Sequence, residues 1–202
     1  GSTTEVVNYA PARTDIILAL DQSASVSKWV DDYNESIATL IRTIATTNQN
    51  REAMAREGAY EDIDADFVNQ SDANMKAAMK DHYMYIAGVI GYNNRLYLKH
   101  DAHTDPTLVI TNEDVEDMIR ACTIKNDYLD YLNGDPNTDQ QDFTRTDLAT
   151  GQMLTWAREG SWDYTYTIND KSYDWTSLAC VLITDGAPYG EADAPARYPE
   201  SS

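Results

Sequence analysis

Basic residues are scarce in this chain of 202 residues. Lys and Arg number 15 against 34 Asp and Glu, which gives a formal net charge of −19. Because nucleic acids and anionic lipid surfaces repel so acidic a chain, neither is expected as a partner. The excess of carboxylates suits a protein that takes up cations. It is equally expected of a secreted or surface protein that must stay soluble, or of a protein from a salt-adapted source.

Cysteine is also scarce. The chain has only Cys122 and Cys180, and neither lies in a metal-binding spacing. Two cysteines exclude a small scaffold that is held together by disulfides. Cys180 lies within an apolar strand pattern, where a buried free thiol is common, so we expect free thiols. A Cys122–Cys180 disulfide remains the alternative for an extracellular protein.

Long apolar runs are missing. No stretch approaches the roughly 18 apolar residues of a membrane-spanning helix, so no membrane insertion is expected. The chain length suits one domain, or one domain with insertions. Gly1 and Ser2 are typical of the scar that tag removal leaves, so we expect residues 1–13 to be a tag remnant and lead-in.

What the chain does contain is an alternation of strand and helix patterns. Continuous apolar runs at residues 15–20 and 178–183 predict strands that are covered on both faces. Apolar residues at spacings of three and four predict a helix at 26–46, and an amphipathic pattern predicts another at 148–158. Thr111 as an N-cap, with Asp114 three residues on, predicts a helix at 113–122. The other expected elements are strands at 83–90 and 108–110, a hairpin partner at 95–99, surface helices within 48–81 and a Tyr/Trp-rich hairpin at 161–176. This alternation predicts an α/β fold with a mostly parallel central sheet and helices on both faces.

Oxygen-bearing side chains follow both apolar strands directly. Asp21, Ser23 and Ser25 occupy alternate positions in the stretch D-Q-S-A-S, and Asp185 follows the strand at 178–183. Ligands of parallel sheets bind at the carboxyl ends of the strands, so both segments are expected at one edge. Carboxylate and hydroxyl oxygens are hard ligands that suit Mg²⁺, Mn²⁺ or Ca²⁺. A serine in this position can also cap the helix that follows, and the two roles are compatible.

Three motifs in this order resemble those of von Willebrand factor type A domains. D-Q-S-A-S at 21–25 resembles the D-x-S-x-S signature of that family, T-R-T-D-L-A-T-G at 144–151 resembles its second loop, and V-L-I-T-D-G at 181–186 resembles its third segment. The resemblance implies a complete metal-ion-dependent adhesion site, formed by Asp21, Ser23, Ser25, Thr146 and Asp185. It also implies the family's Rossmann-like three-layer sandwich, with insertions, over residues 14–186.

In that family the site holds a divalent cation and leaves one coordination place open for an Asp or Glu carboxylate of a protein partner. The resemblance therefore implies a cation-dependent adhesion module that holds Mg²⁺, with Mn²⁺ or Ca²⁺ as alternatives. The chain further resembles bacterial surface and pilus-tip adhesins, which implies an extracellular, cell-surface location. Compared with the family, we expect an insertion at about 48–81, a long loop at 126–143 and an irregular segment at 187–202, where the domain is cut short.

Other functions compete with adhesion. One is a structural or assembly role, in a pilus or an intracellular complex, in which the metal only stabilises the fold. A metal-dependent hydrolase is the least expected, because the sequence has no G-x-S-x-G motif, no phosphate-binding loop and no motif that places a base. His100 and His103 have an H-x-x-H spacing that zinc sites share, but in a polar loop a solvated turn is the expected structure. We therefore do not expect an enzyme.

Overall fold

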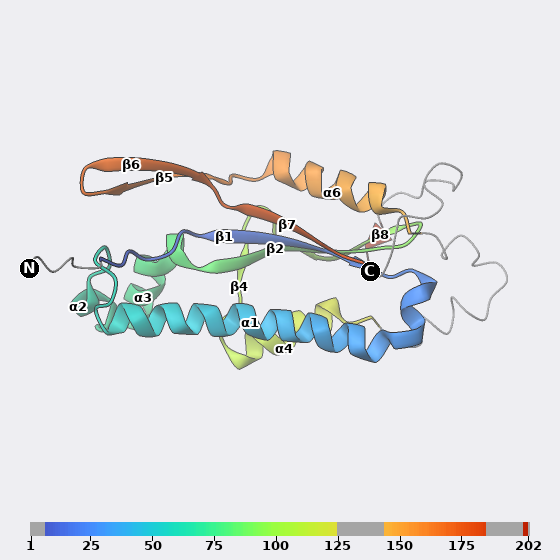
Figure 1. Ribbon diagram of the computed structural model, residues 1–202, viewed down its shortest axis with the longest axis horizontal. Helices are drawn as coiled ribbons and strands as arrows, with labels where there is room; N and C mark the ends of the chain where they lie inside the picture. The colour runs from blue at the N-terminus through green and yellow to red at the C-terminus, as the bar shows by residue number, and fades with distance from the viewer. Residues whose placement is uncertain (1–6, 125–143, 185–199, 202) are drawn as a thin grey trace, which may run out of the picture.

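The computed structural model describes residues 7–124, 144–184 and 200–201 (Figure 1). Their main feature is a mixed sheet with the strand order β7-β1-β2-β3-β8, in which β4 also pairs with β2. The pairs β1–β2, β1–β7 and β3–β8 are parallel, whereas β2 pairs antiparallel with β3 and β4. The strands are β1 (Thr14–Asp21), β2 (Met84–Tyr92), β3 (Leu96–Asp101), β4 (Thr107–Leu108), β7 (Leu178–Ile183) and β8 (Glu200–Ser201). The expected α/β fold with a mostly parallel sheet is confirmed.

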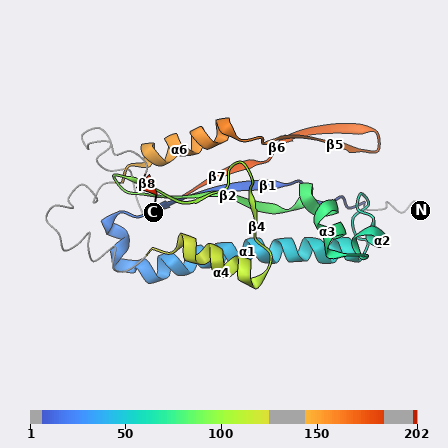
Figure 2. The ribbon, with the colours of Figure 1, turned by 180° about the vertical axis from the view of Figure 1, so that it is seen from behind.

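Helices lie on both faces of this sheet (Figure 2). α1 and α4 lie on one face, and α6 lies on the other. The described helices are η1 (Ala24–Trp29), α1 (Val30–Arg56), α2 (Ala65–Val68), α3 (Asp72–Met79), η2 (Lys80–His82), α4 (Asn112–Cys122) and α6 (Thr146–Glu159). None of them combines the length and the apolar character that a membrane-spanning helix requires.

The core on the α1 face joins alternate residues of β1 to residues three or four apart in α1. These residues are Ile16, Leu18, Leu20, Ile37, Ile41 and Ile44. Such spacings are what one face of a strand and one face of a helix present. α4 completes this side with Met118 and Cys122. It begins with a capping box, in which the Thr111 hydroxyl accepts from the Asp114 N–H and the Asp114 carboxylate accepts from the Thr111 N–H.

The opposite face of β1 packs against α6. The cluster there contains Ile17, Ala19, Ala149, Met153 and Trp156. The Trp156 ring lies directly on Gly88 of β2, where a Cβ atom would come within 2.4 Å of the Trp156 Cζ3. The absence of a side chain at Gly88 therefore lets α6 approach the sheet closely.

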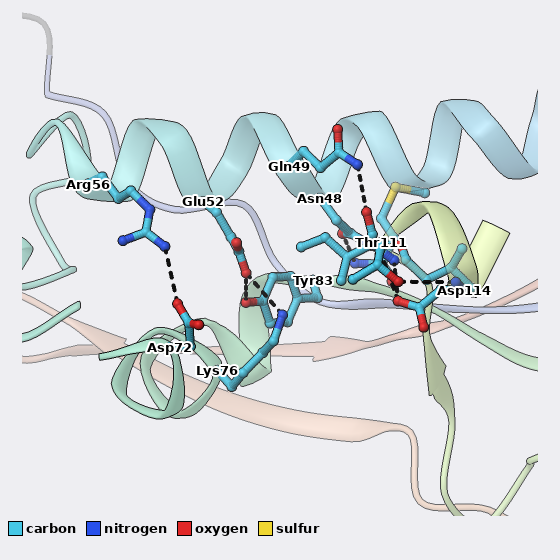
Figure 3. Close-up of polar contacts among 12 residues, drawn as sticks. Asn48, Gln49, Glu52, Arg56, Asp72, Lys76, Tyr83, Thr111 and Asp114 are labelled. Carbon is cyan, nitrogen blue, oxygen red and sulfur yellow. Dashed lines mark hydrogen bonds and ion pairs between the residues drawn. The ribbon is translucent and has the colours of Figure 1, made fainter. Parts of the chain in front are cut away.

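α1 is longer than the sequence pattern predicts. The expected helix ends at residue 46, whereas α1 continues to Arg56. The last turns of α1 are held partly by polar side chains, so an apolar stripe does not mark them. Asn48 is fully buried, donates to the carbonyls of Met84 and Val109, and accepts from the Met84 N–H (Figure 3).

A second, smaller core lies beside the end of α1. Glu52 accepts hydrogen bonds from the Tyr83 hydroxyl and from Lys76 Nζ, as Figure 3 shows. The core itself contains Ala55, Tyr60, Ile63, Val68, Met75, Met79, Tyr83 and Tyr85. The expectation of surface helices within 48–81 is therefore wrong in part, because this segment buries side chains against the amino end of β2.

β7 departs most from the expected burial. Its apolar run predicts a strand covered on both faces, but Val181 is 38% exposed and Leu182 is 40% exposed. Cys180 is exposed as well, so the expectation of a buried thiol there is wrong, although both cysteines are free as expected. The reason is the place of β7 in the sheet: among the described strands it pairs with β1 only. Cys122 is buried, and burial raises the pKa of its thiol to about 12.

The Tyr/Trp-rich segment forms the expected hairpin, whose strands are β5 (Asp163–Ile168) and β6 (Lys171–Thr176). Asn169 and Asp170 make the two-residue turn, with φ angles of 51° and 64°. Such turns require positive φ, which Asn and Asp tolerate better than most residues. On one side of the hairpin Tyr164 stacks on Trp175, with ring centroids 5.3 Å apart.

His103 fixes the carboxyl-terminal end of α6. Its Nδ1 lies 2.5 Å from Asp101 Oδ1, and its Nε2 lies 2.7 Å from Glu159 Oε2. The imidazole also stacks on the Trp156 ring. Burial lowers the pKa of His103, but the hydrogen bonds and charges of the two carboxylates outweigh burial and raise it above its ordinary value. The protonated ring donates to both carboxylates and so holds α6 against the end of β3.

We expect His103→Gln to remove a pH-dependent part of the stability. Because folding raises the pKa of His103, its contribution is fully present below the unfolded value of about 6.5 and is lost as pH rises through the folded value. The free energy of unfolding of the wild type should therefore exceed that of His103→Gln most at acidic pH. Urea titrations between about pH 5.5 and about pH 8.5 measure this gap. A gap that does not change with pH would contradict the role of His103.

Gly88→Ala should destabilise the protein by about 1–3 kcal/mol, the usual cost of overpacking a core. The buried Trp156 ring cannot move away from the new methyl group unless α6 shifts. Gly151→Ala is the matched control in α6, where a Cβ would meet no atom within 4 Å. Because Ala is favoured over Gly within a helix, this variant should lose no stability. Urea unfolding of both variants checks this, and equal losses would show that Trp156 does not limit the approach of α6.

Candidate functional site

The carboxyl ends of β1, β2 and β7 meet at one edge of the sheet. Asp21, the last residue of β1, is the register partner of Tyr92, the last residue of β2. The Gln22 N–H continues this pairing and donates to the Tyr92 carbonyl at 2.8 Å. On the other side, Leu20 pairs with Ile183, the last residue of β7. Asp21 and the segment that leaves β7 therefore lie at the same edge, as the sequence predicts.

The loop after β1 folds back onto the Asp21 carboxylate. Asp21 is fully buried, and its Oδ1 accepts a hydrogen bond from the Ser23 N–H at 2.8 Å. Ser23 is fully buried as well, and its Oγ lies 3.1 Å from the Oγ of Ser25. The alternate spacing in D-Q-S-A-S thus brings one carboxylate and two hydroxyls together in one loop.

The serine hydroxyl of this loop is not used to cap the helix that follows. Ser23 is the N-cap residue of η1, but its side chain makes no capping hydrogen bond. A cap would direct the oxygen to an N–H of the first turn, whereas Ser23 Oγ faces Ser25 Oγ. The capping role expected for Ser23 is therefore not observed.

The segment after β7 reaches the same carboxylate. The Thr184 hydroxyl donates to Asp21 Oδ2 at 2.9 Å, across a separation of 163 residues. The two oxygens of Asp21 thereby connect the first loop to the third segment. The sequence motifs do not predict Thr184 as part of the site. Asp185, which they do predict, lies outside the described residues.

The residues on either side of Thr146, Arg145 and Asp147, hold it near the carboxyl ends of β1 and β2. The residue before it, Arg145, donates its backbone N–H to the Asn93 carbonyl at 2.8 Å, directly after β2. The buried Arg145 guanidinium binds both carboxylate oxygens of Asp147 at 2.8 Å. These hydrogen bonds lower the pKa of Asp147 and fix the first turn of α6. Thr146 therefore begins α6 at the carboxyl end of β2, beside the strand that carries Asp21 (Figure 1).

The oxygen atoms that could bind a metal at this edge belong mainly to hydroxyl groups. One buried carboxylate, Asp21, is combined with the hydroxyls of Ser23, Ser25 and Thr184, and Thr146 begins the neighbouring helix. Oxygen donors of this kind fit Mg²⁺, Mn²⁺ or Ca²⁺. Within residues 7–124, 144–184 and 200–201, no group of three or more His, Cys, Asp and Glu side chains is arranged to hold a metal ion. A site made chiefly of hydroxyls is of a different kind from such a group.

The two histidines of the H-x-x-H spacing have separate partners. His100 Nε2 lies 2.8 Å from Thr107 Oγ1. His103 lies between Asp101 and Glu159, one on each ring nitrogen. The histidines thus contribute to the packing of β3 and α6, and this geometry does not support the zinc alternative.

Sequence reasoning misses the turn between β2 and β3. Asn93 and Asn94 follow β2 directly, and both are fully buried. The signal that was available is an Asn-Asn pair after an apolar strand, because polar residues in that place come to the same edge as Asp21. Motifs made of Asp and Ser residues do not indicate Asn93 and Asn94.

No protein-family model, curated protein or solved structure gives a significant match to this chain. The likeness to von Willebrand factor type A domains therefore rests on the three motifs and stays an expectation.

Proposed function

We propose that the chain is a cation-dependent ligand-binding module of the von Willebrand factor A type. In this proposal it is a Rossmann-like three-layer sandwich that holds Mg²⁺, or Mn²⁺ or Ca²⁺ in its place, beside the carboxyl ends of β1, β2 and β7. The observation that carries the proposal is the buried carboxylate of Asp21, bonded to Ser23 in the first loop and to Thr184 in the third segment. The proposed metal ligands, direct or through water, are Asp21, Ser23, Ser25, Thr146 and Asp185.

Neutral ligands explain how an acidic protein attracts another acid. Ser23, Ser25 and Thr146 carry no charge, so a cation held largely by them keeps much of its positive charge. A bound Mg²⁺ supplies a coordination position that attracts anions. The proposed occupant is the Asp or Glu carboxylate of a protein partner. The described residues orient the loops around that position and bury the Asp21 carboxylate between them.

The composition and the motifs together favour adhesion at a cell surface. A net charge of −19 keeps an exposed protein soluble, and the likeness to bacterial surface adhesins points to the same location. The competing role, in which a cation only stabilises the fold of an assembly subunit, uses the same ligands. The two differ in whether a carboxylate from outside binds to the cation.

Asp21→Asn should abolish Mg²⁺ binding by the metal-stripped protein, because it removes the negative charge and keeps the shape of the side chain. Asp15→Asn is the matched control: Asp15 is also a fully buried residue of β1, but it lies at the opposite end and pairs with Arg13 at 3.0 Å. That variant should lose stability and keep the Mg²⁺ affinity of the wild type. Calorimetric titration measures both affinities, and undiminished binding by Asp21→Asn would refute the proposal.

Ser25→Asp should retain the cation and weaken the capture of a carboxylate, because an added negative ligand neutralises the metal. Ser25 is exposed, so the fold should tolerate the change. Acetate is the probe: when it replaces water on protein-bound Mn²⁺, the relaxation rate of water protons falls. Half-saturation in Ser25→Asp should need about tenfold more acetate than in the wild type, or ~1.4 kcal/mol. No response of the wild type to acetate would favour the role in which the cation only stabilises the fold, and an equal binding of acetate by both proteins would contradict the proposed effect of charge at Ser25.

A further inference from the structure

Asn94 is a buried polar residue whose side chain has no hydrogen-bonding partner among the described residues. It lies in the turn between β2 and β3 and is fully buried. In the described structure, neither its amide nitrogen nor its amide oxygen has a hydrogen-bonding partner. Most buried side-chain polar atoms in proteins are hydrogen-bonded, because an unpaired amide loses its water without compensation. Asn94 therefore requires an explanation that the fold alone does not give.

The other buried asparagines show what a purely structural role looks like. Asn48 uses both ends of its amide, in hydrogen bonds to the backbone of Met84 and Val109. Asn93 closes the turn before β3: its Oδ1 accepts from the Arg95 N–H, and its own N–H donates to the Arg95 carbonyl. The turn is thus held by Asn93, and the side chain of Asn94 is not needed to form it.

Asn94 lies between the two loops that carry the proposed ligands. It is two residues from Tyr92, the register partner of Asp21. It is next to Asn93, whose carbonyl accepts the backbone N–H of Arg145, the residue before Thr146. The loop of Asp21 and the loop of Thr146 are therefore both anchored within two residues of Asn94. Asn94, with its unpaired amide, therefore lies in a turn at the edge where the cation is proposed to bind.

We infer that Asn94 is a further residue of this cation site, an inference that rests on the proposed function. Its Oδ1 serves as an acceptor oxygen toward the cation or toward a water molecule bound to it. Its Nδ2 donates a hydrogen bond to the carboxylate that fills the open coordination place. A carboxylate that binds a metal through one oxygen leaves the other oxygen as an acceptor, and an amide N–H satisfies it without adding charge. Asn94 then contributes both to cation affinity and to the choice of a carboxylate ligand.

The test is Asn94→Leu, which keeps the approximate volume and removes the unpaired polar atoms. Because the amide makes no hydrogen bond in the described structure, the melting temperature of the metal-free variant should equal or exceed that of the wild type. Its Mg²⁺ affinity, measured by calorimetry, should fall by about tenfold or more, as for other groups that support metal ligands. Asn48→Leu is the matched control, and it should melt at a lower temperature and bind Mg²⁺ as the wild type does.

Asn94→Asp separates the two ends of the amide. It keeps an acceptor oxygen, so Mg²⁺ should still bind, but it replaces the donor by a negative charge, so acetate should bind the loaded protein more weakly. The inference is overturned if Asn94→Leu binds Mg²⁺ and acetate as the wild type does while Asp21→Asn binds no Mg²⁺. It is also overturned if metal-free Asn94→Leu loses as much stability as Asn48→Leu. A wild type that binds no Mg²⁺ would refute the proposed function, and this inference with it.

Discussion

The parallel pairing of β1 with β2 on one side and β7 on the other is the constraint on which the described structure depends. It forces the three strands to end together, so that Asp21 meets Tyr92 across one pair and Leu20 meets Ile183 across the other. It also leaves both faces of β1 to be covered, one by α1 and one by α6. Each loop begins where a strand ends. The loops therefore start close together because the strand ends are aligned, and this does not require contacts between the loops. The hydrogen bonds of Asp21 to Ser23 and Thr184 are a consequence of this convergence.

The two ends of β1 bury a carboxylate in different ways. At the amino end Asp15 is compensated by the Arg13 guanidinium at 3.0 Å and by the Ser177 hydroxyl at 2.5 Å. Arg13 in turn lies over the Tyr85 ring, 4.0 Å from its centroid. At the carboxyl end, the Ser23 N–H and the Thr184 hydroxyl that bind Asp21 are neutral donors. Charged donors make stronger hydrogen bonds to a carboxylate than neutral ones. Arg13 thus compensates the buried carboxylate at the amino end of β1, whereas in the proposed function a cation lies beside the carboxylate at the carboxyl end.

Sequence patterns predict the elements of this fold better than they predict its burial. Pattern reading locates β1 and β2 from their apolar runs, α4 and α6 from capping and amphipathic signals, and the hairpin from its Tyr and Trp residues. It misses the last turns of α1, where Asn48 bonds to β2 and no apolar stripe marks the contact. It misjudges β7, because an apolar run does not say how many neighbours a strand has. At the candidate site it identifies residues with ligand oxygens in motifs, but not Asn94, whose amide has no hydrogen-bonding partner among the described residues.

The net charge and the local charge of the proposed site act at different distances. Charges spread over the surface of a protein are screened beyond about 8 Å at physiological ionic strength. The net charge of −19 therefore raises the concentration of cations near the protein and disfavours loose association with anions. It does not bind either kind of ion at a defined position. The groups around the buried Asp21 act over a few ångströms, where screening is weak. A cation held there by neutral hydroxyls attracts a carboxylate only at contact and only in the right orientation. In the proposed function, the acidic surface therefore rejects unspecific anions, and the site selects the one that fits.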